Sequence, residues 1–93
     1  MKFGKKKTQN QQVDIHNVYV FYPASFDDVQ YAIDTLSSGT PLVVSFTKSD
    51  DKSMQRFLDF LSGAIYALKG HVVQMEQRDF LFVPQGIEVL FDN

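Results

Sequence analysis

The pattern of apolar and polar positions divides the chain into a polar beginning and a longer region of regular elements. Residues 1 to about 16 are polar and aperiodic, which is typical of a flexible arm. The run from Val18 to Tyr22 is aromatic and β-branched and stops at Pro23, which predicts a strand. The pattern therefore predicts a flexible basic N-terminal arm over residues 1–16 and one globular domain over residues 17–93.

A first helix is predicted after this strand, because apolar residues recur there at helical spacing. These residues are Phe26, Val29, Ile33 and Leu36. Ser25, followed three residues later by Asp28, resembles a capping box in which Asp replaces the usual Glu or Gln. The segment 37–41 contains two serines, a glycine and a proline, so the helix is expected to end there.

The rest of the chain predicts one more helix and four more strands. Leu42 to Phe46 is almost continuously apolar, and a helix is expected over about residues 51–69. Three short strand-like runs follow, at residues 71–76, 79–83 and 87–91, and they suit an antiparallel meander. The order β-α-β-α-β-β-β predicts an α/β sandwich with two helices packed on one face of a mixed five-stranded sheet, in which a right-handed crossover makes the first two strands parallel.

The second predicted helix is apolar over more of its circumference than one sheet can cover. One stripe consists of Met54, Leu58, Leu61, Ile65 and Leu68, and a second consists of Phe57, Phe60, Ala64 and Ala67. Gly63 lies in mid-helix, where glycine costs about 0.5–1 kcal/mol relative to alanine, and it lies one turn from Ala67. Either these small residues pack under the first helix, or they form a dimer interface on the second face of the helix.

Composition and charge exclude several classes of function. The first seven residues carry four lysines, a formal +4, whereas the remaining 86 residues carry five basic and eleven acidic side chains, or −6. An acidic body argues against a nucleic-acid surface, which needs a basic face. The chain has no cysteine, which excludes disulfides and thiolate metal sites. Without a long apolar span or a signal-peptide pattern, a cytoplasmic protein is expected.

No set of residues predicts catalysis, a metal site or a cofactor. His16 and His71 lack a second ligand at metal spacing, and the sequence contains no nucleophile motif. Two acidic pairs, residues 27–28 and 50–51, precede the predicted helices, where carboxylates cap free amides. The five glycines are scattered singly and cannot form a phosphate-binding loop. An enzyme is therefore not expected.

The second helix and its neighbours resemble a known family. The segment Phe60-Leu61-Ser62-Gly63-Ala64-Ile65-Tyr66-Ala67-Leu68 resembles the FLSGTVYAL-type signature of SepF. The similarity extends over about residues 19–90, and it includes the segments 22–28, 41–46, 79–84 and 86–89. Ser45 stands where the family commonly has Asn, and Gln74 stands where some members have a basic residue.

The resemblance implies a cell-division adaptor that dimerises and binds the C-terminal tail of FtsZ. Such a protein links FtsZ filaments to the inner face of the membrane at the division site. The resemblance implies that Met54, Gln74 and Phe80 contribute to the FtsZ-tail site and that Gly63 lies at the contact between subunits, in a homodimer that could extend into a polymer. The first seven residues are shorter than the family's anchoring helix, so either the membrane-anchoring segment is missing from this sequence or the protein makes weak or indirect membrane contact through the N-terminal arm.

One alternative is a small dimeric ligand-sensing regulatory domain, since small folds of this kind often bind metabolites between subunits. Phe80 also has two interpretations. It shares one face of its predicted strand with Phe82, and that face either packs in the core or lines a binding surface.

Overall fold

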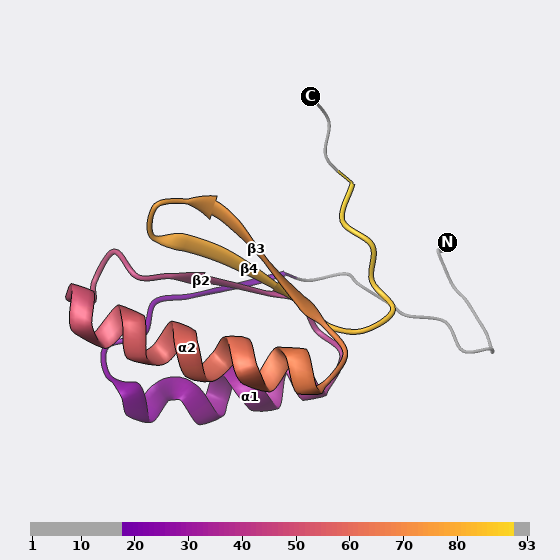
Figure 1. Ribbon diagram of the computed structural model, residues 1–93, viewed down its shortest axis with the longest axis horizontal. Coiled ribbons are helices and arrows are strands. Elements are labelled where there is room, and N and C mark those ends of the chain that lie inside the picture. The colour runs from indigo at the N-terminus through magenta and orange to yellow at the C-terminus, as the bar shows by residue number, and fades with distance from the viewer. Residues whose placement is uncertain (1–17, 91–93) are drawn as a thin grey trace.

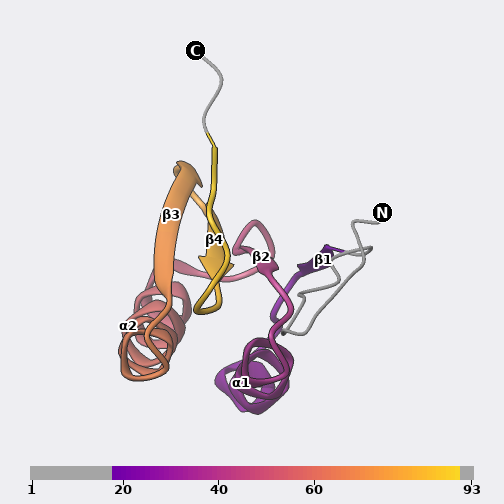
Figure 2. The ribbon, with the colours of Figure 1, turned by 90° about the vertical axis from the view of Figure 1, so that its right-hand side faces the viewer.

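The computed structural model describes residues 18–90, which form a four-stranded sheet with two helices on one side (Figures 1 and 2). The elements are β1 (Tyr19–Phe21), a 3-10 turn η1 (Phe26–Asp28), α1 (Val29–Ser37), β2 (Leu42–Ser45), α2 (Asp51–Ala67), β3 (His71–Glu76) and β4 (Asp79–Val83). The predicted N-terminal arm, residues 1–16, lies outside the described residues.

The sheet is mixed, with strand order β1-β2-β4-β3. β1 and β2 are parallel, as the crossover through α1 predicts, and the other two pairings are antiparallel. Figure 2 shows α2 beneath β3 and β4 and α1 beneath the β1–β2 side, so that both helices cover the same face. The predicted α/β sandwich with its two helices on one face is confirmed.

The predicted fifth strand is wrong for the part of it that the structure describes. Residues 87–90 form neither a helix nor a strand, and Phe91 lies outside the described residues. β4 already lies between β2 and β3, so the chain that leaves β4 has no free edge beside it with which to pair. Gly86, at φ 89°, turns the chain, and Figure 1 shows residues 87–90 leading away from the sheet.

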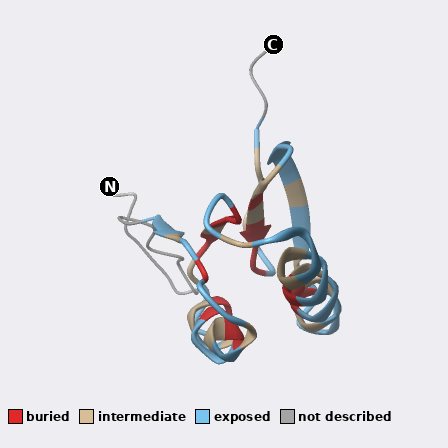
Figure 3. Cartoon of the chain, turned by 90° about the vertical axis from the view of Figure 1, so that its left-hand side faces the viewer, coloured by how far each residue is buried: buried red, intermediate tan, exposed pale blue. Residues whose placement is uncertain are grey.

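The hydrophobic core lies between the sheet and the two helices. Figure 3 shows burial concentrated on β2, on β4 and on the sheet-facing sides of the helices, while the edge strands are largely exposed. Alternate residues of β2 and β4, namely Leu42, Val44, Phe80 and Phe82, belong to the core cluster. The helices contribute mainly Ala32, Leu36, Phe57, Leu61 and Ile65.

The C-terminus of α2 is closed by a Schellman motif that directs the chain into β3. The Gly70 N–H donates to the Ile65 carbonyl at 2.9 Å, and the Lys69 N–H donates to the Tyr66 carbonyl at 3.0 Å. Lys69 has the left-handed conformation, with φ 68°. Gly70 serves a different need, because a Cβ there would collide with the Val83 carbonyl oxygen. The absence of a side chain lets the start of β3 approach β4 closely.

Candidate functional site

The three residues expected to bind a partner lie on α2 and on the β3–β4 hairpin. Gln74 of β3 pairs directly with Phe80 of β4, and its side chain is exposed. Phe80 is only 7% exposed, and its ring packs edge-on against Phe46 at a centroid distance of 5.9 Å. Met54, in the first turns of α2, is partly buried against the core cluster that contains Phe80. We call Met54, Gln74 and Phe80 the hairpin site.

The structure therefore gives the residues of the hairpin site different surroundings. Gln74 is accessible to a partner, and its amide donates a 3.3 Å hydrogen bond to the Glu76 carbonyl within the same strand. Met54 is partly exposed to solvent. Phe80 faces the helices from within the sheet, so most of its ring contributes to the core.

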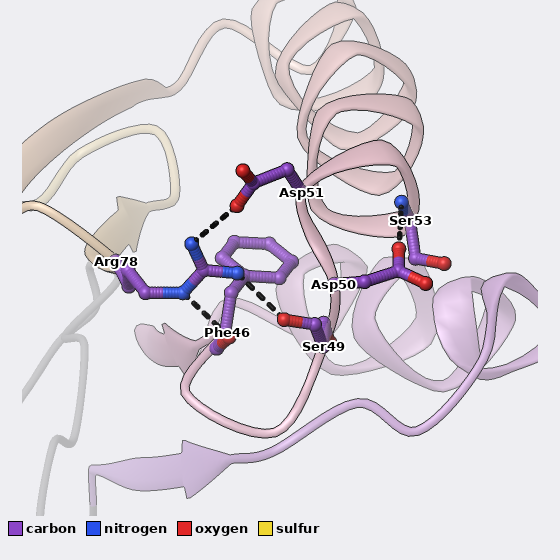
Figure 4. Close-up of polar contacts among 6 residues, drawn as sticks. All are labelled: Phe46, Ser49, Asp50, Asp51, Ser53 and Arg78. Carbon is purple, nitrogen blue, oxygen red and sulfur yellow. Dashed lines mark hydrogen bonds and ion pairs between the residues drawn. The ribbon is translucent and has the colours of Figure 1, made fainter.

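Arg78 joins the turn of the β3–β4 hairpin to the loop that precedes α2 (Figure 4). Its Nε donates to the Phe46 carbonyl at 3.0 Å and its Nη2 donates to the Ser49 carbonyl at 2.6 Å. Its Nη1 forms an ion pair with Asp51 at 2.8 Å. The backbone adds a fourth bond, in which the Phe46 N–H donates to the Arg78 carbonyl at 2.8 Å.

Sequence reasoning missed Arg78. The residue occupies a hairpin turn where Asn-Gly or Asp-Gly pairs are the usual signal, and an arginine at that position carries no recognised pattern. Two of its partners are backbone carbonyls 29 and 32 residues away, which no side-chain motif marks.

Asp50 caps the start of α2. Its Oδ1 accepts a 2.7 Å hydrogen bond from the Ser53 N–H, as the capping interpretation of this acidic pair predicts. The backbone and side-chain hydrogen bonds from Ser53 lower the pKa of Asp50, and the nearby charges of Lys52 and Arg78 act in the same direction against a small effect of desolvation. Asp28 has a different role at the start of η1, where it completes the predicted capping box with Ser25, and its Oδ2 accepts from the Ala24 and Ser25 N–H groups.

The cap at Asp50 predicts a pH dependence of stability. The pKa of Asp50 is lower in the folded protein than in the unfolded chain. The contribution of the Asp50 charge to the free energy of unfolding is therefore complete above the ordinary aspartate pKa and is lost as the pH falls through the lowered folded value. We expect Asp50→Ala to have a lower melting temperature than the parent at neutral pH, and the difference to shrink in strong acid. Thermal unfolding of both proteins across the pH range measures this. A difference that stays constant in acid would show that the charge of Asp50 does not contribute.

One side of α2 leaves small residues open on the surface. Gly63 is exposed, and a Cβ built on it would meet no atom within 4 Å. Ala67, one turn further along, is also exposed. Gly63 therefore does not pack under α1, and the sequence interpretation that placed it there is wrong.

Aromatic residues lie on either side of these small residues. Phe60 is 51% exposed and Tyr66 is 81% exposed. The Phe60 ring packs edge-on against Phe26 at 5.4 Å, and the Arg56 guanidinium lies 4.0 Å from the centroid of the Phe26 ring. We call Phe60, Gly63 and Ala67 the open face of α2. Its combination of small and large apolar residues suits contact with another protein surface.

The described residues give information on metal sites, membrane spans and hollows. Among residues 18–90, no three His, Asp or Glu side chains gather closely enough to hold a metal ion. In the same range, no helix combines the length and the apolar character that a membrane span needs. A shallow hollow of about 270 Å³ lies at the end of α2 opposite the hairpin site, lined in part by Leu36, Leu68 and Pro84.

Comparison with known proteins assigns the fold and the family. The family model "Cell division protein SepF" matches residues 18–89, which is almost the whole described region. The SepF-like protein from Archaeoglobus fulgidus has the same fold, with a TM-score of 0.73 at 19% identity, over 82% of this chain and 94% of that one. The chain belongs to the SepF family.

Curated relatives agree with this assignment. The cell division protein SepF of Carboxydothermus hydrogenoformans is 44% identical over 68 residues, which make up 73% of this chain and 50% of the relative. That of Acetivibrio thermocellus is 35% identical over 94 residues, covering 96% of this chain and 61% of the relative. The chain thus spans between half and two thirds of the length of these relatives. A solved structure of Methanobrevibacter smithii SepF in complex with FtsZ-CTD matches with a TM-score of 0.65 at 13% identity, over 81% of this chain and 98% of that one.

Proposed function

We propose that this domain is the partner-binding part of a cell-division adaptor that binds the C-terminal tail of FtsZ. The SepF match over residues 18–89 carries the proposal. It is supported by the fold shared with Methanobrevibacter smithii SepF, which was solved in complex with FtsZ-CTD. Through this contact the protein links FtsZ filaments to the inner face of the membrane at the division site. Its role is binding rather than catalysis.

The hairpin site is the proposed position of the FtsZ tail. A short peptide gains affinity by placing a few apolar side chains against a preformed surface, while its own backbone is ordered at a cost. Met54 is partly exposed and offers apolar contact, to which Phe80 can add only its small exposed part, and Gln74 offers a polar group at the rim. The two parts of the site come from segments about twenty residues apart in the sequence: Gln74 pairs with Phe80, and Met54 packs against the core cluster to which Phe80 belongs.

Titration of the full chain with a synthetic FtsZ tail peptide tests the proposal. We expect saturable binding, and no binding of a scrambled peptide of the same composition. Gln74→Ala is expected to change the dissociation constant by less than about threefold, because rim contacts contribute little to affinity. Gln30→Ala, on the exposed surface of α1, provides the matched control. Failure of the parent protein to bind would remove the adaptor function, and a large loss in Gln74→Ala would move this residue to the centre of the site.

The open face of α2 is the proposed dimer interface, with Gly63 and Ala67 at the point of closest approach. The distance between two packed helices depends on the side chains at their crossing, and small residues there permit a short one. The open space around Gly63 and the exposed Phe60 ring support this position. Because such a twofold interface uses the same face of both subunits, it closes as a dimer, and a polymer would require a second contact elsewhere on the surface.

Membrane contact is proposed for the N-terminal arm. Four lysines lie within its first seven residues, and each near an anionic lipid surface contributes about 1 kcal/mol. Met1 and Phe3 are its only large apolar side chains in that stretch, so the contact is weak and sensitive to salt.

A further inference from the structure

Arg78 links the two segments that carry the hairpin site, namely the β3–β4 hairpin and the start of α2, although it is not one of the three residues of that site. The hairpin that carries Gln74 and Phe80 turns at Arg78, and the guanidinium reaches across to the loop that leads into α2. Three residues after the start of that helix comes Met54. The backbone carbonyl of Phe46 accepts from Arg78, and the ring of the same residue packs directly on Phe80. Contacts that converge on this one side chain therefore join the open end of the hairpin to the start of α2, beyond the end of the β2–β4 ladder and in addition to the shared core.

The chemistry of these contacts requires arginine. The planar guanidinium donates in three directions at once, to two carbonyl oxygens and one carboxylate. A lysine ammonium at the end of a flexible stem cannot hold the same three acceptors with fixed geometry. Among residues 18–90, loss of the guanidinium would leave one hydrogen bond between the loop of residues 46–51 and the hairpin turn, from the Phe46 N–H to the Arg78 carbonyl.

The contacts differ in their expected importance. The bonds to the Phe46 and Ser49 carbonyls are partly buried, whereas the Asp51 side chain is 90% exposed. Exposed ion pairs contribute little, because water and salt screen them. The Phe46 carbonyl also accepts from the Ser49 N–H at 3.1 Å, so it keeps a partner when Arg78 is removed. Removal of the guanidinium therefore loosens the loop more than it unfolds the domain.

We propose that Arg78 is a positioning residue for partner binding, which holds the β3–β4 hairpin against the start of α2 so that the hairpin site is formed before the FtsZ tail arrives. This inference rests on the proposed function. When the surface is already ordered, none of the binding free energy is used to order it. A loosened hairpin therefore lowers the affinity even though every contact with the peptide is kept.

The test compares Arg78→Ala, Arg78→Lys and Asp51→Asn in the full chain. We expect Arg78→Ala to bind the FtsZ tail peptide about tenfold more weakly, Arg78→Lys to recover part of the loss, and Asp51→Asn to bind within about twofold of the parent. Amide hydrogen exchange should become faster in residues 46–51 of Arg78→Ala, both with and without peptide. A second variant, Val29→Ala, truncates a core residue of α1 away from the hairpin and controls for lost stability.

The outcomes separate positioning from general stability. Parent-like binding by Arg78→Ala would overturn the proposal, as would an equal loss of binding in Val29→Ala once the two variants are compared at the same fraction folded. If the parent itself does not bind the peptide, the adaptor function fails and this role of Arg78 fails with it. Faster exchange in residues 46–51 with unchanged affinity would leave Arg78 as a structural clamp only, and would also overturn the proposal.

Discussion

Phe80→Ala is expected to lower the free energy of unfolding by about 3 kcal/mol or more. Phe80 is 7% exposed and packs on Phe46, and truncation of a buried phenylalanine typically costs about 3–5 kcal/mol. A core of this size supplies only about 3–5 kcal/mol in total, so much of the variant should be unfolded at room temperature. Urea unfolding followed by circular dichroism measures the loss. Tyr31→Ala, at a half-exposed aromatic residue, should cost much less.

This expected instability determines how the role of Phe80 in binding must be tested. Phe80→Ala should weaken binding of the FtsZ tail at least tenfold, but unfolding alone would produce that result. Phe80→Leu keeps most of the apolar volume, and such replacements usually cost less than truncation. Weaker binding by a folded Phe80→Leu would support Phe80 as a contact of the peptide. Unchanged binding would show that Phe80 serves the core alone and that the peptide contacts the accessible residues Met54 and Gln74 instead.

The elements that the sequence predicted correctly are those whose signals are local. Helical spacing gave α1 and α2 to within a few residues, and the runs at 71–76 and 79–83 match β3 and β4. The run at 87–91 is also strand-like in composition, yet residues 87–90 do not form a strand. The composition of a run indicates that it suits a strand, but it does not show whether a neighbouring strand has a free edge. That information resides in the strand order, which places β4 in the interior of the sheet.

The candidate site shows the same limit. The sequence placed Phe80 and Phe82 on one face of a strand but could not tell which face the helices cover, and the structure places both in the core. The two interpretations of Gly63 depended on the position of α1, which spacing along α2 does not encode. Arg78 was missed because its partners include backbone carbonyls of a distant loop. Residues whose role depends on long-range contacts are thus the ones that required the structure.

Gly63→Lys is expected to convert a dimeric protein into monomers. If the open face of α2 is the interface, a lysine at Gly63 would place an unpaired charge at the closest approach of two helices, where burial without a partner is costly. The monomer itself has room for the side chain, because nothing lies within 4 Å of the Cβ position. The folded subunit should therefore survive while the association is lost. Sedimentation or light scattering over a range of concentrations measures the change.

Two further variants make this result specific to the helix crossing. Gln85→Lys adds the same charge in an exposed loop and should leave the dimer intact. Gly63→Ala should stabilise the isolated helix, because alanine is favoured over glycine there by about 0.5–1 kcal/mol, yet it should weaken the dimer by widening the crossing. A gain in stability combined with weaker association would be difficult to explain without an interface at Gly63. A parent protein that remains monomeric at high concentration, or a Gly63→Lys variant that still dimerises, would place the contact elsewhere.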